Sequence, residues 1–149
     1  MKYAGSSLSV LNAETGDVIF SSNGNTGLAS ASTLKTITSA SAYHILGKDF
    51  TWETTLGYSG TISANGTLNG DLIITGGGDP ALGSDRYDQS RPDLILKKWA
   101  DDLTRIGIKN ITGQIIADDR LFGTETMPGG WTWQDMGNYY GAGPSSLTW

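Results

Sequence analysis

Length, composition and charge exclude several classes of protein: the 149 residues suffice for one domain or two small units, and the absence of cysteine rules out disulfides, thiol catalysis and cysteine-bound metals. A net charge of −5 without any cluster of Lys and Arg argues against nucleic acid as a partner. The longest apolar runs are much too short for a transmembrane segment, and residues 1–7 lead in without the apolar region of a signal peptide.

Two short apolar runs near the N-terminus predict a β-hairpin. Residues 8–11 and 18–20 flank a polar loop that contains Thr15-Gly16. After a second polar loop, a stretch free of Gly and Pro predicts a helix over residues 32–46, and Gly47 is a natural residue to end it.

The chain changes character after residue 50, where strand-forming segments alternate with tight turns. Residues 51–58, 71–75 and 111–117 have the composition of strands. The dipeptides Asn65-Gly66 and Asn69-Gly70 are typical of turns. We therefore expect a mixed α/β fold with small sheets.

A second helix is predicted to begin near residue 90. Ser90 at the N-cap and Asp93 three residues later match a capping box, and Gly107 would close the helix. Residues 122–149 are aromatic and Gly-rich without clear periodicity. The apolar residues expected on one face of the helix are Leu96, Trp99, Leu103 and Ile106.

The S-x-x-K pattern formed by Ser32 and Lys35 is the strongest candidate for a catalytic site. Residues three apart on a helix share a face, so the lysine amine would lie beside the serine hydroxyl, as a serine nucleophile without a histidine base requires. The single histidine, His44, lies about 18 Å further along a continuous helix, which excludes a Ser-His-Asp triad centred on Ser32. From the motif alone, a capping serine beside a solvated lysine is the alternative interpretation.

Three acidic residues and a glycine run were considered as ligand sites. Residues 76–80 follow a strand but lack the G-K-S/T ending of a phosphate loop, so they predict a tight structural turn. Asp79, Asp118 and Asp119 could in principle share a hard cation, but acidic residues at strand ends usually serve as turn or cap residues. We therefore predict no metal and no cofactor.

The aromatic residues of the C-terminal segment have two interpretations. They could form a platform for a sugar or a peptide, or they could simply pack an irregular segment, which is the interpretation we favour. The residues concerned are Trp131, Trp133, Tyr139 and Tyr140.

The order of these patterns resembles that of a known enzyme family. The hairpin with its Thr15-Gly16 turn, followed by Ser32-Thr33-Leu34-Lys35-Thr36 and Leu46-Gly47, resembles the start of the penicillin-binding D-Ala-D-Ala carboxypeptidases. One departure from the family pattern is Ser30, where the family often has proline. This difference should affect the rigidity of the loop and not the chemistry of the site. Later segments in the right order are similar to the S13 peptidase group in particular: residues 49–54, residues 66–82, Gly107-Ile108, residues 111–113, Asp118-Asp119 and residues 140–142.

The resemblance implies a serine-type acyl-transfer enzyme that acts on peptidoglycan stem peptides in the periplasm or the extracellular cell envelope. Ser32 would attack the carbonyl of the penultimate D-Ala, Lys35 would take its proton, water would hydrolyse the acyl-enzyme, and β-lactams would acylate the same serine. The family completes its site with an S-x-N motif and a K-T-G strand. Here the strings Ser21-Ser22-Asn23 and Ser63-Ala64-Asn65 are poorly placed, and no K-T-G occurs. We therefore expect an N-terminal fragment that is inactive alone.

The same resemblance implies a division into two parts. Residues 1–47 would form the N-terminal part of the penicillin-binding, transpeptidase-like domain, with the hairpin and the nucleophile helix. Residues 48–149 would form most of an inserted α/β domain. Two alternatives stay open: a non-catalytic cell-envelope binding module on the same scaffold, and a serine β-lactamase, against which the long insertion argues. The preference for carboxypeptidase or endopeptidase action stays open as well.

Overall fold

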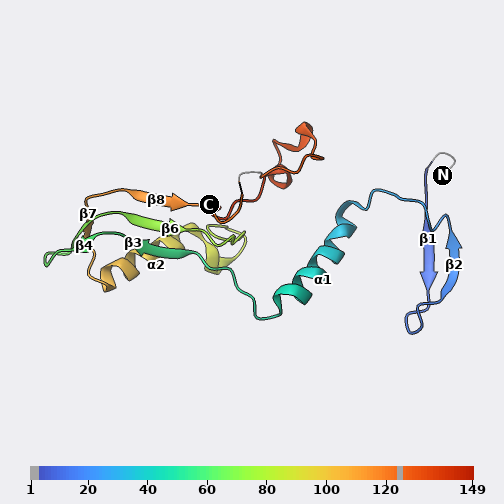
Figure 1. Ribbon diagram of the computed structural model, residues 1–149, viewed down its shortest axis with the longest axis horizontal. Coiled ribbons are helices and arrows are strands. Elements are labelled where there is room, and N and C mark those ends of the chain that lie inside the picture. Colours follow the sequence, from blue (N-terminus) through green and yellow to red (C-terminus); the bar gives the residue numbers. More distant parts are fainter. Residues whose placement is uncertain (1–3, 124–125) are drawn as a thin grey trace. The chain divides into compact units, whose positions relative to one another are not determined.

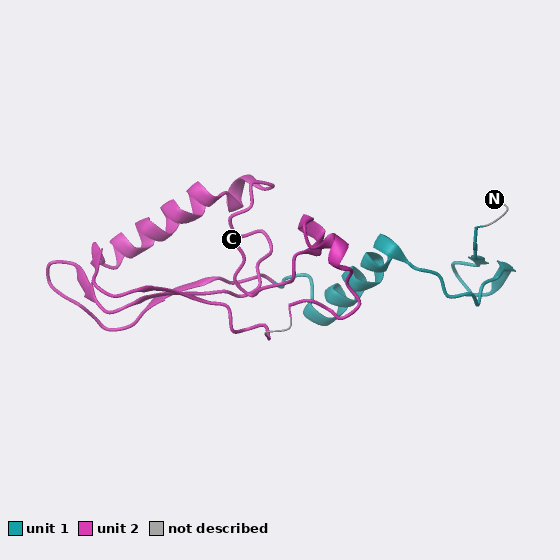
Figure 2. Ribbon diagram, turned by 90° about the horizontal axis from the view of Figure 1, so that it is seen from above, with its two compact units in different colours: residues 1–50 teal, residues 51–149 magenta. Residues whose placement is uncertain are grey.

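The computed structural model describes residues 4–123 and 126–149 (Figure 1). Its contacts divide the chain into two compact units, Met1–Phe50 and Thr51–Trp149 (Figure 2). Both helices and strands occur, and the strands form small sheets, which confirms the expected mixed α/β class. Within the described ranges, none of the helices combines the length and the apolar character needed to cross a bilayer.

The first unit begins with the predicted β-hairpin. Strands β1 (Leu8–Leu11) and β2 (Val18–Ser22) pair in antiparallel fashion. The connecting loop is held by the side chain of Asn12, whose Oδ1 accepts the backbone N–H of Glu14 at 2.8 Å. Gly16 adopts a φ of 78°, which explains the glycine at this turn.

The second element of this unit is the predicted helix. Residues Ala31–Thr33 form a short 3-10 helix, η1, which leads into α1 (Leu34–Leu46). Gly47 has a φ of 83° and donates its N–H to the carbonyl of Tyr43 at 3.0 Å. The helix and its glycine end are therefore confirmed, and the regular α-helix begins two residues later than predicted.

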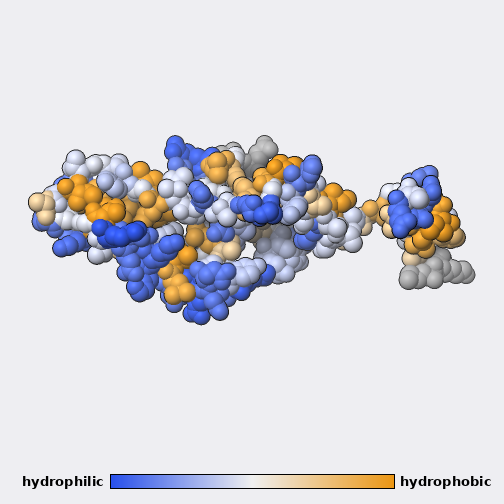
Figure 3. Space-filling view, turned by 90° about the horizontal axis from the view of Figure 1, so that it is seen from below, coloured by the Kyte–Doolittle hydropathy of each residue, from blue (hydrophilic) through white to orange (hydrophobic). Residues whose placement is uncertain are grey.

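Apolar side chains of the first unit are largely exposed. All described residues of Met1–Phe50 are classed as exposed, including those of the hairpin and of α1. Figure 3 shows apolar residues (orange) on the surface of the hairpin. Apolar surface of this kind usually marks a face that another segment or protein covers. The most exposed examples are Val18, Ile19, Ile37, Tyr43 and Ile45.

The described residues of the second unit form two three-stranded sheets. In one, β3 (Thr55–Tyr58) lies antiparallel to β6 (Leu72–Thr75), which runs parallel to β8 (Ile115–Asp118). The other has the order β4-β5-β7, with β4 antiparallel to β5 and β5 parallel to β7. Its strands are β4 (Thr61–Ile62), β5 (Thr67–Asn69) and β7 (Asn110–Ile111).

Each predicted strand segment is present, but with altered limits. Residues 51–58 contribute a regular strand only from Thr55. The predicted strand 111–117 is interrupted, because the backbone N–H of Gln114 turns to Asp71 Oδ1 at 2.8 Å. This contact separates β7 from β8 and places them in different sheets.

Helix α2 (Pro92–Arg105) connects β6 to β7. The predicted capping box is wrong: the N-cap residue is Arg91, and the Ser90 hydroxyl donates to the backbone carbonyls of Ser84 and Tyr87, at 2.9 and 3.1 Å. Pro92 at the first helical position sets the helix start instead. Three short 3-10 helices complete the unit: η2 (Asp88–Ser90), η3 (Trp133–Asp135) and η4 (Tyr139–Gly141).

The apolar face of α2 also differs in part from the prediction. Trp99 and Leu103 are partly buried, as expected. Leu96 is 54% exposed and Ile106 is 50% exposed, contrary to the prediction, whereas Ile95 is partly buried. The side of α2 that packs toward the sheet is therefore rotated about the helix axis relative to the predicted side. The buried apolar side chains among the described residues of the unit are Leu68, Leu72, Leu82 and Ile108.

Three consecutive glycines after β6 allow separate segments to meet. A Cβ on Gly77 would overlap the carbonyl oxygen of Glu53, and one on Gly76 would overlap that of Ser146. Gly78 donates its N–H to the Ser146 carbonyl at 2.7 Å. The glycine run is therefore a point where separate segments cross, and the tight turn predicted for residues 76–80 begins only at Pro80.

Candidate active site

The structure brings the two residues of the S-x-x-K motif into contact. Ser32 lies in η1 and Lys35 in the first turn of α1. Their spacing of three places them on one side of the helix start, and Lys35 Nζ donates to Ser32 Oγ at 3.0 Å. Both side chains are exposed. A hydroxyl and an amine at this distance can exchange a proton directly.

The backbone beside Ser32 is held in an unusual conformation. Ala31 has a φ of 45°, in the left-handed region that residues with a Cβ seldom adopt. The turn is fixed on its other side, because both the N–H and the hydroxyl of Thr33 donate to the carbonyl of Ser30. A strained residue of this type costs about 1–3 kcal/mol and is found preferentially at functional sites.

Among the residues that the structure describes, no other titratable side chain hydrogen-bonds to Ser32 or Lys35. His44 lies in the last turn of α1, at the opposite end of the helix from Lys35. The first turn of α1 carries no acidic residue, so no carboxylate from that turn competes for the lysine amine. The pair therefore consists of a hydroxyl with one amine, the arrangement that a serine–lysine nucleophile needs.

Two of the three acidic residues that could share a cation, Asp79 and Asp118, make local contacts instead. Asp79 Oδ1 accepts the backbone N–H of Ala81 at 2.8 Å, which forms an Asx turn. Asp118 binds the Arg120 guanidinium at 2.7 and 2.8 Å, and this charge-assisted hydrogen bonding lowers the pKa of Asp118 to about 2. Across residues 4–123 and 126–149, no cluster of three or more acidic or histidine side chains is arranged to hold a metal ion.

The packing interpretation of the C-terminal aromatic residues is wrong, because all four rings are exposed. Trp133 is 85% exposed and Tyr139 is 82% exposed. Tyr139 contacts Tyr140 edge to face at 5.4 Å and lies under the guanidinium of Arg86 at 5.6 Å. These rings present surface rather than fill a core.

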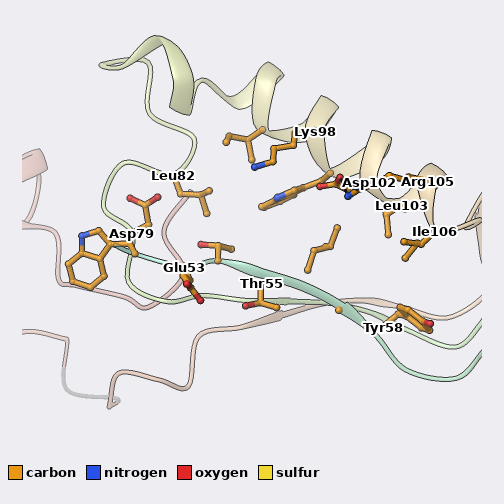
Figure 4. A pocket seen from close by; sticks show the side chains of 16 residues that line it. Glu53, Thr55, Tyr58, Asp79, Leu82, Lys98, Asp102, Leu103, Arg105 and Ile106 are labelled. Atoms are coloured by element: carbon orange, nitrogen blue, oxygen red, sulfur yellow. Dashed lines mark hydrogen bonds and ion pairs between the residues drawn. The ribbon is translucent and has the colours of Figure 1, made fainter. Parts of the chain in front are cut away.

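A cavity that the sequence patterns did not predict lies in the second unit, between α2 and β3 (Figure 4). Lys98 and Trp99 contribute to it from the helix, and Leu56 contributes from the strand. No linear motif marks these residues, because the two elements are far apart in the sequence. The only available signal was the charged and apolar side chains that alternate along one side of α2.

Comparison with known proteins identifies a consistent set of relatives. The model of the D-Ala-D-Ala carboxypeptidase 3 (S13) family matches residues 1–149. The D-alanyl-D-alanine carboxypeptidase DacB of Haemophilus influenzae is 33% identical over 135 residues, which cover 91% of this chain and 26% of the relative. A D-alanyl-D-alanine carboxypeptidase of an Actinomadura species is 29% identical over 139 residues, or 93% of this chain and 24% of the relative.

Solved structures give the same result. The crystal structure of penicillin binding protein 4 (dacB) from Haemophilus influenzae aligns with a TM-score of 0.72 at 32% identity, over 88% of this chain and 27% of that one. The same protein complexed with a novel β-lactam aligns with a TM-score of 0.59 at 33% identity, over 75% of this chain and 24% of that one. The chain thus spans about a quarter of the length of the relatives that it matches.

Proposed function

The chain belongs to the D-Ala-D-Ala carboxypeptidase 3 (S13) family, and we propose that it forms part of a serine-type D-Ala-D-Ala carboxypeptidase or endopeptidase of the cell envelope. Ser32 is the nucleophile and Lys35 is its base. The observation that carries this proposal is the 3.0 Å contact between Lys35 Nζ and Ser32 Oγ at the start of α1. The β-lactam complex of a relative supports β-lactams as ligands of the same serine.

The reaction follows from the chemistry of the pair. As Ser32 Oγ attacks the carbonyl of the penultimate D-Ala of a stem peptide, neutral Lys35 accepts the hydroxyl proton. The peptide bond breaks, the lysine returns the proton to the departing amine, and D-Ala leaves. Water then hydrolyses the ester on Ser32, which releases the shortened peptide and restores the hydroxyl. A β-lactam forms the same kind of ester by opening of its ring.

Two structural parts serve this function. We assign residues 1–47 to the transpeptidase-like catalytic domain and residues 48–149 to an inserted α/β domain. The division of the contacts after Phe50 supports this assignment. The apolar side chains exposed on the hairpin and on α1 support it as well, because a catalytic domain would cover them.

Labelling with a fluorescent penicillin tests the proposal against its alternatives. We expect the full-length protein to form a covalent adduct on Ser32, located by mass spectrometry of the digested protein, and to release it slowly. A non-catalytic envelope module would form no adduct, and a β-lactamase would release it at a high turnover rate. Either of these outcomes would disprove the carboxypeptidase assignment.

We expect the 149-residue chain alone to release no D-Ala from a D-Ala-D-Ala peptide. The reason is chemical: its sequence contains no K-T-G, and its two S-x-N strings belong to a hairpin end and to a turn. Loss of one member of a cooperative catalytic site lowers the rate by orders of magnitude. The measurement is D-Ala release by the purified chain, with Ser32→Ala as the control. Release by the chain that is absent from the control would contradict this expectation.

A further inference from the structure

The cavity between α2 and β3 has the dimensions of a small-molecule site. It measures about 600 Å³, within the range of roughly 300–1,000 Å³ that ligand pockets occupy. All of its lining residues lie in Thr51–Trp149, so this unit alone forms it. Its apolar wall comprises Leu56, Leu82, Ile95, Trp99 and Leu103.

The apolar wall is firmly built at one end. Leu82 is among the buried core residues, at 8% exposure. The Trp99 ring packs against Trp149 in a tilted arrangement, with a centroid separation of 5.8 Å and an interplanar angle of 37°. These contacts fix the positions of two large side chains, so an entering apolar group would meet a surface that is already ordered.

Two charged groups at the cavity retain bonding capacity. Within the described part of the chain, no hydrogen bond or ion pair engages the Lys98 ammonium, although its neighbour Lys97 is bound to Asp101 at 2.6 Å. Asp79 uses Oδ1 for the Ala81 N–H, which leaves Oδ2 available. Figure 4 shows Lys98 on the helix and Asp79 on the loop after β6, both at the end of the cavity near Leu82.

The other charges at the cavity restrict the type of ligand. Asp102 and Arg105 neutralise each other, with a distance of 2.6 Å from Arg105 Nη2 to Asp102 Oδ1. The remaining lining charges, those of Glu53, Asp79 and Lys98, are predominantly negative. A polyanion such as a phosphorylated sugar is therefore disfavoured. A ligand with one carboxylate for Lys98, one amine for Asp79 and an apolar body between them matches the lining.

We propose that this cavity is a non-catalytic binding site for a short zwitterionic peptide. The peptide's carboxylate binds Lys98, its amine binds Asp79, and its aliphatic atoms pack against Leu82. The choice of peptide rests on the proposed function, which supplies peptides of this class. None of the cavity residues is Ser32 or Lys35, so the site is tested independently of catalysis.

Titration calorimetry of the whole chain with the tripeptide L-Ala-D-Ala-D-Ala, which carries one amine and one carboxylate, tests the proposal. We expect Lys98→Met to weaken binding about tenfold, which is the low end for loss of a hydrogen bond between charged groups. The matched control, Lys97→Met, removes a lysine one position away and should leave the affinity unchanged. Amidation of the tripeptide's carboxylate should lower its affinity for the wild-type chain by the same factor. The same amidation should not lower its affinity for Lys98→Met any further.

Other outcomes separate this site from the candidate active site. Ser32→Ala should bind the tripeptide as tightly as the unchanged chain does. Binding that is lost in Ser32→Ala and retained in Lys98→Met would place the peptide at the catalytic pair, which overturns the cavity proposal and leaves the proposed function intact. The cavity proposal would also be overturned if the chain did not bind the tripeptide at millimolar concentration, or if Lys97→Met and Lys98→Met lost the same amount of affinity. Asp79→Asn provides a second variant. It removes the negative charge that binds the peptide's amine, and its side-chain carbonyl can still accept the Ala81 N–H.

Discussion

Replacement of Lys35 by arginine in the full-length protein is expected to slow acylation of Ser32 by benzylpenicillin by about 10²- to 10⁴-fold, the range of general base catalysis. Arginine preserves the charge and can still donate a hydrogen bond to Ser32 Oγ, as Lys35 Nζ does at 3.0 Å. It cannot accept the hydroxyl proton, because a guanidinium stays protonated. The rate is measured at pH 7 by stopped-flow mixing with a fluorescent penicillin.

Two controls make this result specific. Lys48→Arg changes an exposed lysine just beyond α1 that is paired with Asp49 at 2.9 Å, and it should acylate at the wild-type rate. Lys35→Ala should be about as slow as Lys35→Arg, with little change in the free energy of unfolding, because the side chain is exposed. Acylation of Lys35→Arg at close to the wild-type rate would show that Lys35 is not the base.

The second large effect is on stability. Gly77→Ala is expected to lower the free energy of unfolding of residues 51–149 by about 2–3 kcal/mol, the upper part of the range for overpacking. The added methyl group would overlap the backbone carbonyl of Glu53, which a side-chain rotation cannot relieve. Urea denaturation followed by tryptophan fluorescence measures the change.

The matched control for this variant is Gly57→Ala in β3. An added Cβ at Gly57 meets no atom within 4 Å, and the same methyl group should therefore cost less than about 0.5 kcal/mol. Equal urea midpoints for Gly77→Ala and Gly57→Ala would contradict the close crossing of chain segments at the glycine run.

Local patterns predicted the parts of the structure that depend on local contacts. The hairpin, α1 and its end at Gly47 follow from residues close together in the sequence, and so does the contact between Ser32 and Lys35. The capping box failed because the Ser90 hydroxyl finds carbonyl partners in the preceding loop. That competition is invisible to a motif that considers only the residues after the cap.

The structural features that local sequence patterns did not predict depend on tertiary contacts. The strand expected over residues 111–117 is divided by a contact with Asp71, which lies more than forty residues earlier. The cavity joins β3 to α2, and neither element carries a recognisable ligand motif. The exposure of Trp133 and Tyr139 depends equally on which segments lie nearby, and aromatic composition alone gives no measure of that.

The parallel strand pairs of the second unit determine when it can fold during synthesis. The hairpin β1–β2 closes within one short segment and can form as soon as that segment leaves the ribosome, because hairpins form in about 1–10 μs. β6 has no parallel partner until β8 has emerged, and the Asp71–Gln114 hydrogen bond beside that pair spans 43 residues. At roughly 5–20 residues per second, the apolar strand Leu72–Thr75 therefore waits for seconds with one edge unpaired. While residues 76–118 are being translated, the unpaired edge of β6 is therefore a place where a nascent chain can pair wrongly with another strand.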